Sequence, residues 1–356
     1  MSTTATEDRA ESLRMIRDST AVIMPPDGGL GRVRGLRFTL PGVDPAVWQS
    51  MGEMGWIGLR LPEEAGGIGL GMAEACALLE ELGRALVPEP LIAGALSARL
   101  LAGTGDTMLL PSLLAGQSLV LTAWQQAAGS LEAPGDPAAP RILIPMAAAA
   151  QALLLPVREG GMLALYAMEG ARPAILKMQD GGHAGTLAPD LASARRIGSD
   201  VSEVMELALD EAALGTAAYL LGLMERCFEM TLDYLRARQQ FGKPLGSFQA
   251  LQHRAADLKI QIVLTRASVG GAAADLDAGA TGDARRALVS RAKARAAEAA
   301  MRVTREAVQL HGAIGYTDEY DIGLFLRKAM VMANAFGSSA LHRARYMRST
   351  AEARAT

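Results

Sequence analysis

The segment from Arg238 to Gln252 joins two predicted helices and carries more polar chemistry than a connector needs. It reads RQQFGKPLGSFQALQ. Arg238 offers a planar fork of donors that suits a phosphate or diphosphate, and glutamines such as Gln240 and Gln249 both donate and accept hydrogen bonds. These residue types predict a site for a polar, phosphorylated cofactor. A solvated connector anchored by Phe241 is the simpler interpretation when residue chemistry alone is considered.

A second group of polar residues stands in VQLHGAIGYTDEYDIG. A predicted helix ends at Gly312, with Gln309 and His311 in its last turn, and Gly315 permits a close backbone approach. A single histidine there more often caps the helix than acts as a base, and we interpret His311 in that way. The four histidines show no metal-ligand spacing, so no metal site is predicted.

Other catalytic motifs are missing from the sequence. It contains no GxSxG, HExxH, P-loop or CxxC pattern. The glycines of AGGIGLG follow no predicted strand, so they do not form a dinucleotide-binding fingerprint. The nature of the catalytic group is therefore not evident from motifs alone.

Composition limits the class of protein. The chain has 356 residues, a net charge of −3 and 50% hydrophobic residues, which gives no electrostatic case for nucleic acid or an acidic membrane. Its polar beginning, MSTTATEDRAESLRMIRDST, is not a signal peptide, and apolar runs such as MLALYAM are too short to span a bilayer. Cys76 and Cys227 fall in helical patterns and are predicted to be buried thiols. We expect a cytoplasmic protein.

The elements that must position these residues fall into three segments. Residues 1–117 are predicted to form a helical domain, with a loop from Pro25 to Gly42 and a helix capped by Asp44 and begun by Pro45. Residues 118–204 contain short apolar runs that predict four or more strands. Residues 205–356 predict a four-helix bundle. The expected fold is mostly α-helical with a small central β domain.

With these pieces in order, the chain resembles the acyl-CoA dehydrogenase family. The stretch WQSMGEMGWIGLRLPEEAGGIGLGMAEACALLEELGRAL resembles the family's N-terminal helical domain. RQQFGKPLGSFQALQ resembles its flavin-binding elbow, the connector between two bundle helices, and VQLHGAIGYTDEY its second nucleotide-contacting turn. The resemblance covers nearly the whole chain.

This resemblance implies an FAD site shared between subunits. The elbow of one subunit would reach the flavin held by its neighbour, in a homotetramer built as two dimers. The residues expected to bind the cofactor are Arg238, Gln240 and Phe241, with Gln249 close by, then Gln309 and Gly312 from the second turn, and Ser338.

The family's reaction removes the α-proton of an acyl-CoA thioester with a glutamate while the β-hydride passes to flavin. In most members this glutamate precedes a Gly-Thr or Gly-Ser pair. Here that position is Phe336, followed by Gly337 and Ser338. The alternate position used by some members is Ala212, and Glu211 is one residue away, which rotates a helical side chain by about 100°. Glu211 is our candidate base, although an ordinary acidic residue near a helix N-terminus is the simpler interpretation.

The middle segment departs from the family in the parts that cradle the flavin. LTAWQQAAGSL keeps Thr122 of the usual Thr-Glu-Pro stretch, and RILIPMAAAA lacks the usual Trp and Thr of the following strand. Two hypotheses follow. In the first, the chain is an FAD-dependent acyl-CoA dehydrogenase that uses Glu211 or an unrecognised carboxylate and passes electrons to an electron-transferring flavoprotein. In the second, it is a base-deficient subunit that completes the FAD site of a paralogue in a mixed tetramer.

Overall fold

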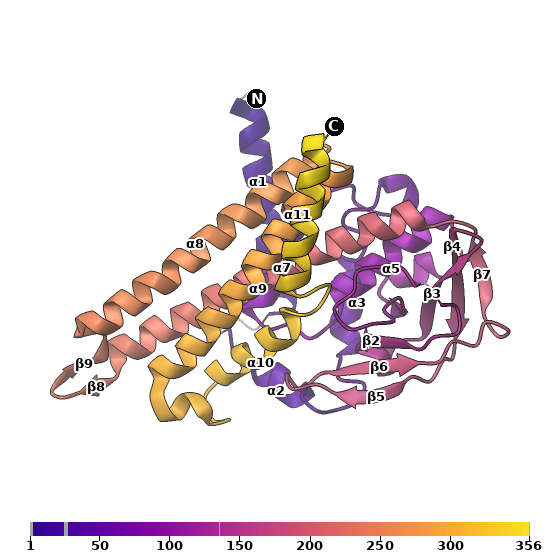
Figure 1. Ribbon diagram of the computed structural model, residues 1–356. Helices are drawn as coiled ribbons and strands as arrows, with labels where there is room; N and C mark the ends of the chain where they lie inside the picture. Colours follow the sequence, from indigo (N-terminus) through magenta and orange to yellow (C-terminus); the bar gives the residue numbers. More distant parts are fainter. Residues whose placement is uncertain (1–2, 25–27, 135, 356) are drawn as a thin grey trace.

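A computed structural model describes residues 3–24, 28–134 and 136–355 (Figure 1). Helices come first, strands follow, and helices return, so the mostly helical fold with a small central β region is confirmed. The first helices are α1 (Thr3–Ser19), α2 (Gly31–Leu36), α3 (Pro45–Glu53), α4 (Met72–Arg84), α5 (Leu91–Thr104) and α6 (Leu110–Leu114). The strands of the middle segment are β1 (Val120–Thr122), β2 (Arg141–Pro145), β3 (Ala152–Glu159), β4 (Met162–Glu169), β5 (Ala174–Lys177), β6 (His183–Leu187) and β7 (Arg195–Gly198). The last part holds α7 (Ser202–Ala237), the hairpin β8 (Gln239–Gln240) and β9 (Lys243–Pro244), α8 (Gln249–Asp277), α9 (Gly282–His311), α10 (Ile322–Met332) and α11 (Ser339–Ala355).

The start of α3 follows its sequence signal. Asp44 has an extended backbone and its side chain accepts a hydrogen bond from the Ala46 N–H, as expected of an N-cap. The segment before it was predicted as a loop, which is wrong in part, because it contains α2. Tertiary contacts explain this short helix: Arg32 donates to the buried carboxylate of Glu89 at 2.6 Å.

The strands form two small sheets. One has the order β1-β3-β4-β7, with β1 and β3 parallel and the other pairs antiparallel; the second has the order β2-β6-β5 and is antiparallel. The first six residues of β3 are all buried, which is why that strand reads as a continuous apolar run rather than an alternating one. These sheets lie on the side of the molecule away from the hairpin β8–β9 (Figure 1).

The long helix α7 is the central element of the structure. It is long and apolar enough to cross a membrane by composition, but 89% of its most apolar window is buried inside the protein. It packs against α4 and α5 of the N-terminal helices and against α8, α9 and α10. Cys227 on α7 and Cys76 on α4 are both buried free thiols. The apolarity of α7 therefore reflects a core helix.

Two glycines let α4 and α7 approach closely. A Cβ atom on Gly83 would lie 2.0 Å from the carbonyl oxygen of Tyr219, and one on Gly222 would lie 1.8 Å from that of Glu80. Neither position has room for a side chain. This contact brings the N-terminal helices and the bundle together.

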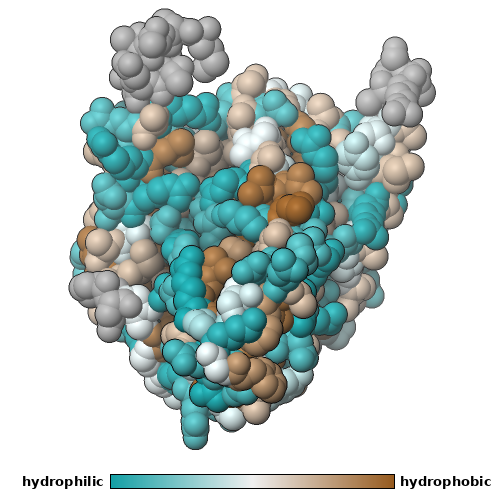
Figure 2. All heavy atoms as spheres, turned by 90° about the vertical axis from the view of Figure 1, so that its left-hand side faces the viewer, coloured by the Kyte–Doolittle hydropathy of each residue, from teal (hydrophilic) through white to brown (hydrophobic). Residues whose placement is uncertain are grey.

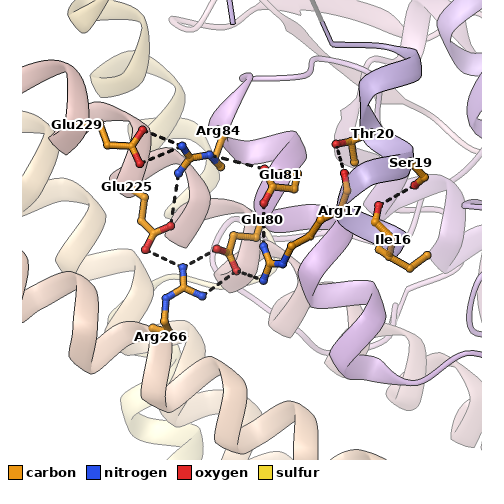
Figure 3. A network of polar contacts seen from close by, with 10 residues as sticks. All are labelled: Ile16, Arg17, Ser19, Thr20, Glu80, Glu81, Arg84, Glu225, Glu229 and Arg266. Atoms are coloured by element: carbon orange, nitrogen blue, oxygen red, sulfur yellow. Dashed lines mark hydrogen bonds and ion pairs between the residues drawn. The ribbon is translucent and has the colours of Figure 1, made fainter. Parts of the chain in front are cut away.

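An ion-pair network runs beside this contact and links α1, α4, α7 and α8 (Figure 3). Arg266 donates to Glu80 and contacts Glu225, and Arg17 donates to Glu80 from the other side. Burial acts to raise the pKa of Glu80, but the hydrogen bonds and charges of Arg266 and Arg17 outweigh it and lower that pKa. The network also includes Glu81, Arg84 and Glu229.

Candidate functional site

The elbow contains the hairpin β8–β9, which has a two-residue turn. It projects from the molecule between the end of α7 and the start of α8 (Figure 1). Its turn residues, Phe241 and Gly242, have φ values of 54° and 78°, as a type I′ turn requires. A left-handed backbone is unfavourable for a bulky residue and persists mostly where function requires it. The Phe241 side chain is nonetheless 88% exposed and meets Phe248 edge-on at 6.2 Å between ring centroids. Figure 2 faces this end of the molecule and shows apolar patches among polar side chains.

Two polar side chains of the elbow, those of Arg238 and Gln240, have no partner in the part of the chain that is described, whereas Ser247 and Gln252 donate to backbone carbonyls within the elbow. The side chains of Arg238 and Gln240 are exposed, and neither makes a hydrogen bond or ion pair among residues 3–24, 28–134 and 136–355. The nearby Arg236 differs, because it pairs with Asp233 at 3.2 Å. A free guanidinium beside free amides fits the donor set that a diphosphate needs.

The second predicted turn lies at the same end of the bundle. Tyr234 in the last turn of α7 stacks on His311 in the last turn of α9, with ring centroids 4.4 Å apart. Gln309 and Gly312 next to His311 are exposed. The structure therefore brings the elbow and the second turn to one end of the molecule, although 68 residues separate Gln240 and Gln309 along most of two helices.

His311 itself is buried rather than available as a base. Its Nδ1 lies 2.7 Å from the Ala307 carbonyl, which must accept, so Nδ1 carries the proton. Burial lowers the pKa of His311, which keeps the ring neutral. The ring fills the space between Tyr234 and Tyr320, whose centroids lie 4.4 and 5.0 Å away.

Two further expected contact residues occupy helix starts. Gln249 is the first residue of α8 and is exposed. Ser338 precedes α11, and its hydroxyl accepts a hydrogen bond from the Leu341 N–H at 3.3 Å, which is N-cap geometry. Gln249 lies next to the elbow, whereas Ser338 lies next to Phe336.

Phe336 occupies a left-handed turn between α10 and α11, with φ of 52°. Its ring lies nearly parallel to that of Trp124, with an interplanar angle of 15° and centroids 6.5 Å apart. Trp124 is buried and follows β1. The position at which the family resemblance predicts a base therefore presents a phenyl ring to the β region.

Glu211 faces a different set of neighbours. Its Oε1 accepts from Arg60 Nε and Arg99 Nη2, both at 2.9 Å, and its Oε2 accepts from Arg99 Nε at 3.2 Å. Its side chain is 13% exposed. The interpretation of Glu211 as a helix N-terminal acid is wrong, because α7 begins nine residues earlier, at Ser202. Ala212, the alternate base position, is buried.

Asp210 is also held by arginines. Arg345 on α11 reaches its Oδ1 at 2.5 Å, and Arg285 on α9 reaches its Oδ2 at 2.8 Å. Its side chain is 1% exposed. Asp210 thus joins three helices of the bundle, and it too is no helix N-terminal residue.

In the β region, where the sequence departs from the family's flavin cradle, polar side chains make internal contacts. The Thr122 hydroxyl lies 2.9 Å from that of Ser97, and both are buried. Arg141, at the start of the strand that departs from the family pattern, is fully buried and donates to backbone carbonyls, among them Ala139 and Pro156. The elbow therefore fits a dinucleotide, whereas the Thr122 hydroxyl is already paired with Ser97. The Nε of Arg141 has no hydrogen-bond partner in the described chain, but it is buried.

Two cavities border α7. One of about 60 Å³ lies beside Glu211 among apolar residues of α4 and α5. The other, about 200 Å³, lies between Leu163 of β4 and Met205 of α7, with Arg345 and Glu206 on its wall. Within the described ranges, no group of three or more His, Cys, Asp or Glu side chains is arranged to hold a metal ion.

The residues that contact Phe336 and Glu211 were not predicted from the sequence. Trp124 was visible as one of three tryptophans in an aromatic-poor chain. Arg60 and Arg99 gave no signal, because they lie 151 and 112 residues from Glu211.

Comparisons with known proteins agree with this organisation. The acyl-CoA dehydrogenase N-terminal domain family matches residues 37–107, and the C-terminal domain family matches residues 202–351. Acyl-CoA dehydrogenase IpdE2 of Mycobacterium tuberculosis is 32% identical over 329 residues, which cover 90% of this chain and 91% of that protein.

Two solved structures of heteromeric assemblies share the fold. The Tcur3481–Tcur3483 steroid ACAD G363A variant superposes with a TM-score of 0.83 at 27% identity, covering 99% of each chain. The ChsE4–ChsE5 complex from Mycobacterium tuberculosis has the same TM-score at 25% identity and covers 99% of this chain and 98% of that one. Together with the domain matches, these similarities show that the chain belongs to the acyl-CoA dehydrogenase family, a family of FAD-dependent oxidoreductases.

Proposed function

We propose that this chain is a base-deficient subunit of a flavin-dependent acyl-CoA dehydrogenase. It would complete the FAD site of a paralogous subunit that carries the catalytic glutamate, in a mixed tetramer. The observation that carries this proposal is Phe336, which occupies the base position and stacks on Trp124. A phenyl ring cannot accept a proton from the α-carbon of a thioester.

Glu211 is a poor replacement for that base. General base catalysis needs a carboxylate with a free lone pair within hydrogen-bond reach of the proton that it abstracts. Both oxygens of Glu211 already accept from Arg60 or Arg99. Two guanidinium groups stabilise the carboxylate as an anion and hold it against α5, so we assign Glu211 to structure rather than chemistry.

The function left to this chain is binding of FAD through the elbow. Arg238 and Gln240 would hold the diphosphate of FAD, with Gln309 and Gly312 from the second turn and Gln249 beside them. Phe241 would pack against the same nucleotide or the surface around it. FAD, when bound, supplies the acceptor for the β-hydride of the acyl-CoA. The exposure of all these groups in a single chain supports a role across a subunit boundary.

The relatives support a mixed assembly over a homotetramer. The two solved structures named above each combine two different chains, Tcur3481 with Tcur3483 and ChsE4 with ChsE5. We extend that composition to this chain. A cytoplasmic location and electron transfer to an electron-transferring flavoprotein belong to the same proposal.

The proposal is tested by purifying the chain alone and with a paralogue that carries a glutamate before its Gly-Thr pair. Alone, the chain should retain less than one flavin per subunit, and acyl-CoA should not bleach the flavin absorbance. Together, the two chains should form a complex with bound FAD that an acyl-CoA bleaches. Full flavin occupancy and rapid bleaching in the isolated chain would instead support the first hypothesis, an autonomous dehydrogenase.

A further inference from the structure

We propose that Lys293 and His342 are positioning residues that hold the turn between α10 and α11, and so determine where the side chain of residue 336 lies. The inference rests on the proposed function only in that residue 336 is taken as the position of the base in related chains. Neither residue has a role in the site described above. Both are fully buried, Lys293 on α9 and His342 on α11.

Lys293 binds the turn through its ammonium group. Its Nζ donates to the carbonyl oxygens of Ala333 and Gly337, both at 2.9 Å, and lies 3.4 Å from that of Met332. Met332 is the last residue of α10, so the lysine satisfies carbonyls that have no partner at the end of that helix. No carboxylate pairs with Lys293 among the residues that the structure describes. Its contacts therefore go to the turn rather than to an ion pair.

His342 binds the same turn from the other side. Its Nε2 lies 2.8 Å from the Phe336 carbonyl, which can only accept, so Nε2 must carry the proton. Its Nδ1 lies 3.3 Å from the hydroxyl of Ser290 on α9, which can donate to it. Burial, opposed in part by the Phe336 carbonyl, lowers the pKa of His342 to about 3, so the ring stays neutral in this arrangement.

The turn needs such support because its backbone is strained. Phe336 and Gly337 have φ values of 52° and 99°, in the left-handed region. A bulky residue in that region persists only where surrounding contacts fix it. Gly337 also lies against the histidine, since a Cβ atom there would be 2.6 Å from His342 Nε2. His342 holds the carbonyl of the strained residue, Phe336, and Lys293 holds that of the next residue, Gly337, whose positive φ is accessible to glycine.

Holding this backbone directs the side chain. With its carbonyl bound to His342, Phe336 points its ring toward Trp124 of the β region. In this chain the turn that Lys293 and His342 hold therefore presents a phenyl ring, not a carboxylate, at residue 336.

The inference is tested by fluorine NMR of the isolated chain labelled with 5-fluorotryptophan, in which no flavin is needed. The chain has three tryptophans, so three resonances are expected, and Trp124→Phe identifies the one from Trp124. Phe336→Leu shows how far loss of the phenyl ring moves that resonance. Lys293→Met and His342→Leu should each move or broaden the Trp124 resonance by more than one linewidth and leave those of Trp48 and Trp56 in place.

Two further variants separate positioning from general loss of packing. His342→Gln keeps a side-chain N–H that can donate to the Phe336 carbonyl, so its Trp124 resonance should return toward the unsubstituted position. Thr304→Val removes a buried hydroxyl on α9, the helix of Lys293. That hydroxyl donates to the Ala300 carbonyl one turn earlier, so the substitution should lower stability without moving the Trp124 resonance. If Lys293→Met does not fold, the comparison of His342→Leu with His342→Gln decides. An unmoved Trp124 resonance in His342→Leu would overturn the inference. A shift in Thr304→Val equal to that in His342→Leu would also overturn it.

Discussion

Arg99 grips the carboxylate of Glu211 with two of its nitrogens, Nη2 at 2.9 Å from Oε1 and Nε at 3.2 Å from Oε2. This bidentate pair joins α5 to α7, and Arg60 extends it from the segment before α4. Such planar pairing gives both strength and a fixed geometry. The carboxylate of Glu211, one residue before Ala212, is thereby part of the contact between the N-terminal helices and the bundle.

Replacing Glu211 should therefore affect stability more than catalysis. Glu211→Gln leaves Arg99 without its counter-charge in a largely buried place and leaves Arg60 with only Asp277 as an ion-pair partner, so we expect a loss of about 1–3 kcal/mol of unfolding free energy. Urea unfolding measures it. Glu203→Gln replaces an exposed residue in the first turn of α7 and is the control. Its unfolding free energy should stay within about 0.5 kcal/mol of the unsubstituted value. Loss of flavin bleaching in the assembled enzyme with unchanged stability would instead identify Glu211 as the base.

Arg238 and Arg236 offer a matched test of the elbow. Both are exposed, but only Arg236 has an ion-pair partner within the described chain, Asp233. Arg238→Ala should weaken FAD retention in the assembled complex by roughly 10- to 100-fold, because a charge-assisted hydrogen bond to phosphate is worth about 1.5–3 kcal/mol. Arg236→Ala should not. Fluorescence of released flavin during dilution measures both, and equal retention in the two variants would remove Arg238 from the site.

The α4–α7 crossing should tolerate no side chain at Gly222. A Cβ atom there would lie 1.8 Å from a backbone oxygen, so Gly222→Ala should cost about 3 kcal/mol or more, or prevent folding. Gly270→Ala on α8 is the opposite case, since nothing lies within 4 Å of the added atom. It should stabilise the isolated chain by about 0.5–1 kcal/mol through helix propensity. Thermal unfolding of both variants checks the pair, and similar effects at the two positions would contradict the close approach.

Burial of Lys293 gives stability a defined pH dependence. Burial lowers its pKa to about 7, below the value of about 10.4 expected in the unfolded chain. Between these values the unfolded state binds more protons, so the unfolding free energy contributed by this group rises with pH. From pH 7 to pH 9 we expect the native chain to gain about 1–2 kcal/mol relative to Lys293→Met.

This comparison uses denaturant unfolding of both proteins at each pH. The difference between the two proteins isolates the contribution of Lys293 from that of the groups that titrate in both. Parallel pH profiles for the two proteins would show that Lys293 keeps its ordinary pKa in the folded state.

The order of helices, strands and helices was predictable from local patterns, because apolar periodicity and capping signals such as Asp44–Pro45 act within a few residues. The elbow and the second turn were predictable for the same reason, since each is a continuous run of side chains. The absence of a glutamate at position 336 was also predictable as a hypothesis, because Phe336 stands in a short segment that resembles the family's.

The roles of single residues were decided only by the folded chain. Glu211 became an ion-pair residue through arginines more than 100 residues away in sequence, and no local pattern records such a contact. The ring of Phe336 stacks on Trp124, and the backbone of its turn is held by Lys293 and His342. These three partners come from three other parts of the chain. Local sequence specifies which elements form, whereas the partners of a buried charge or a strained turn depend on how distant elements pack.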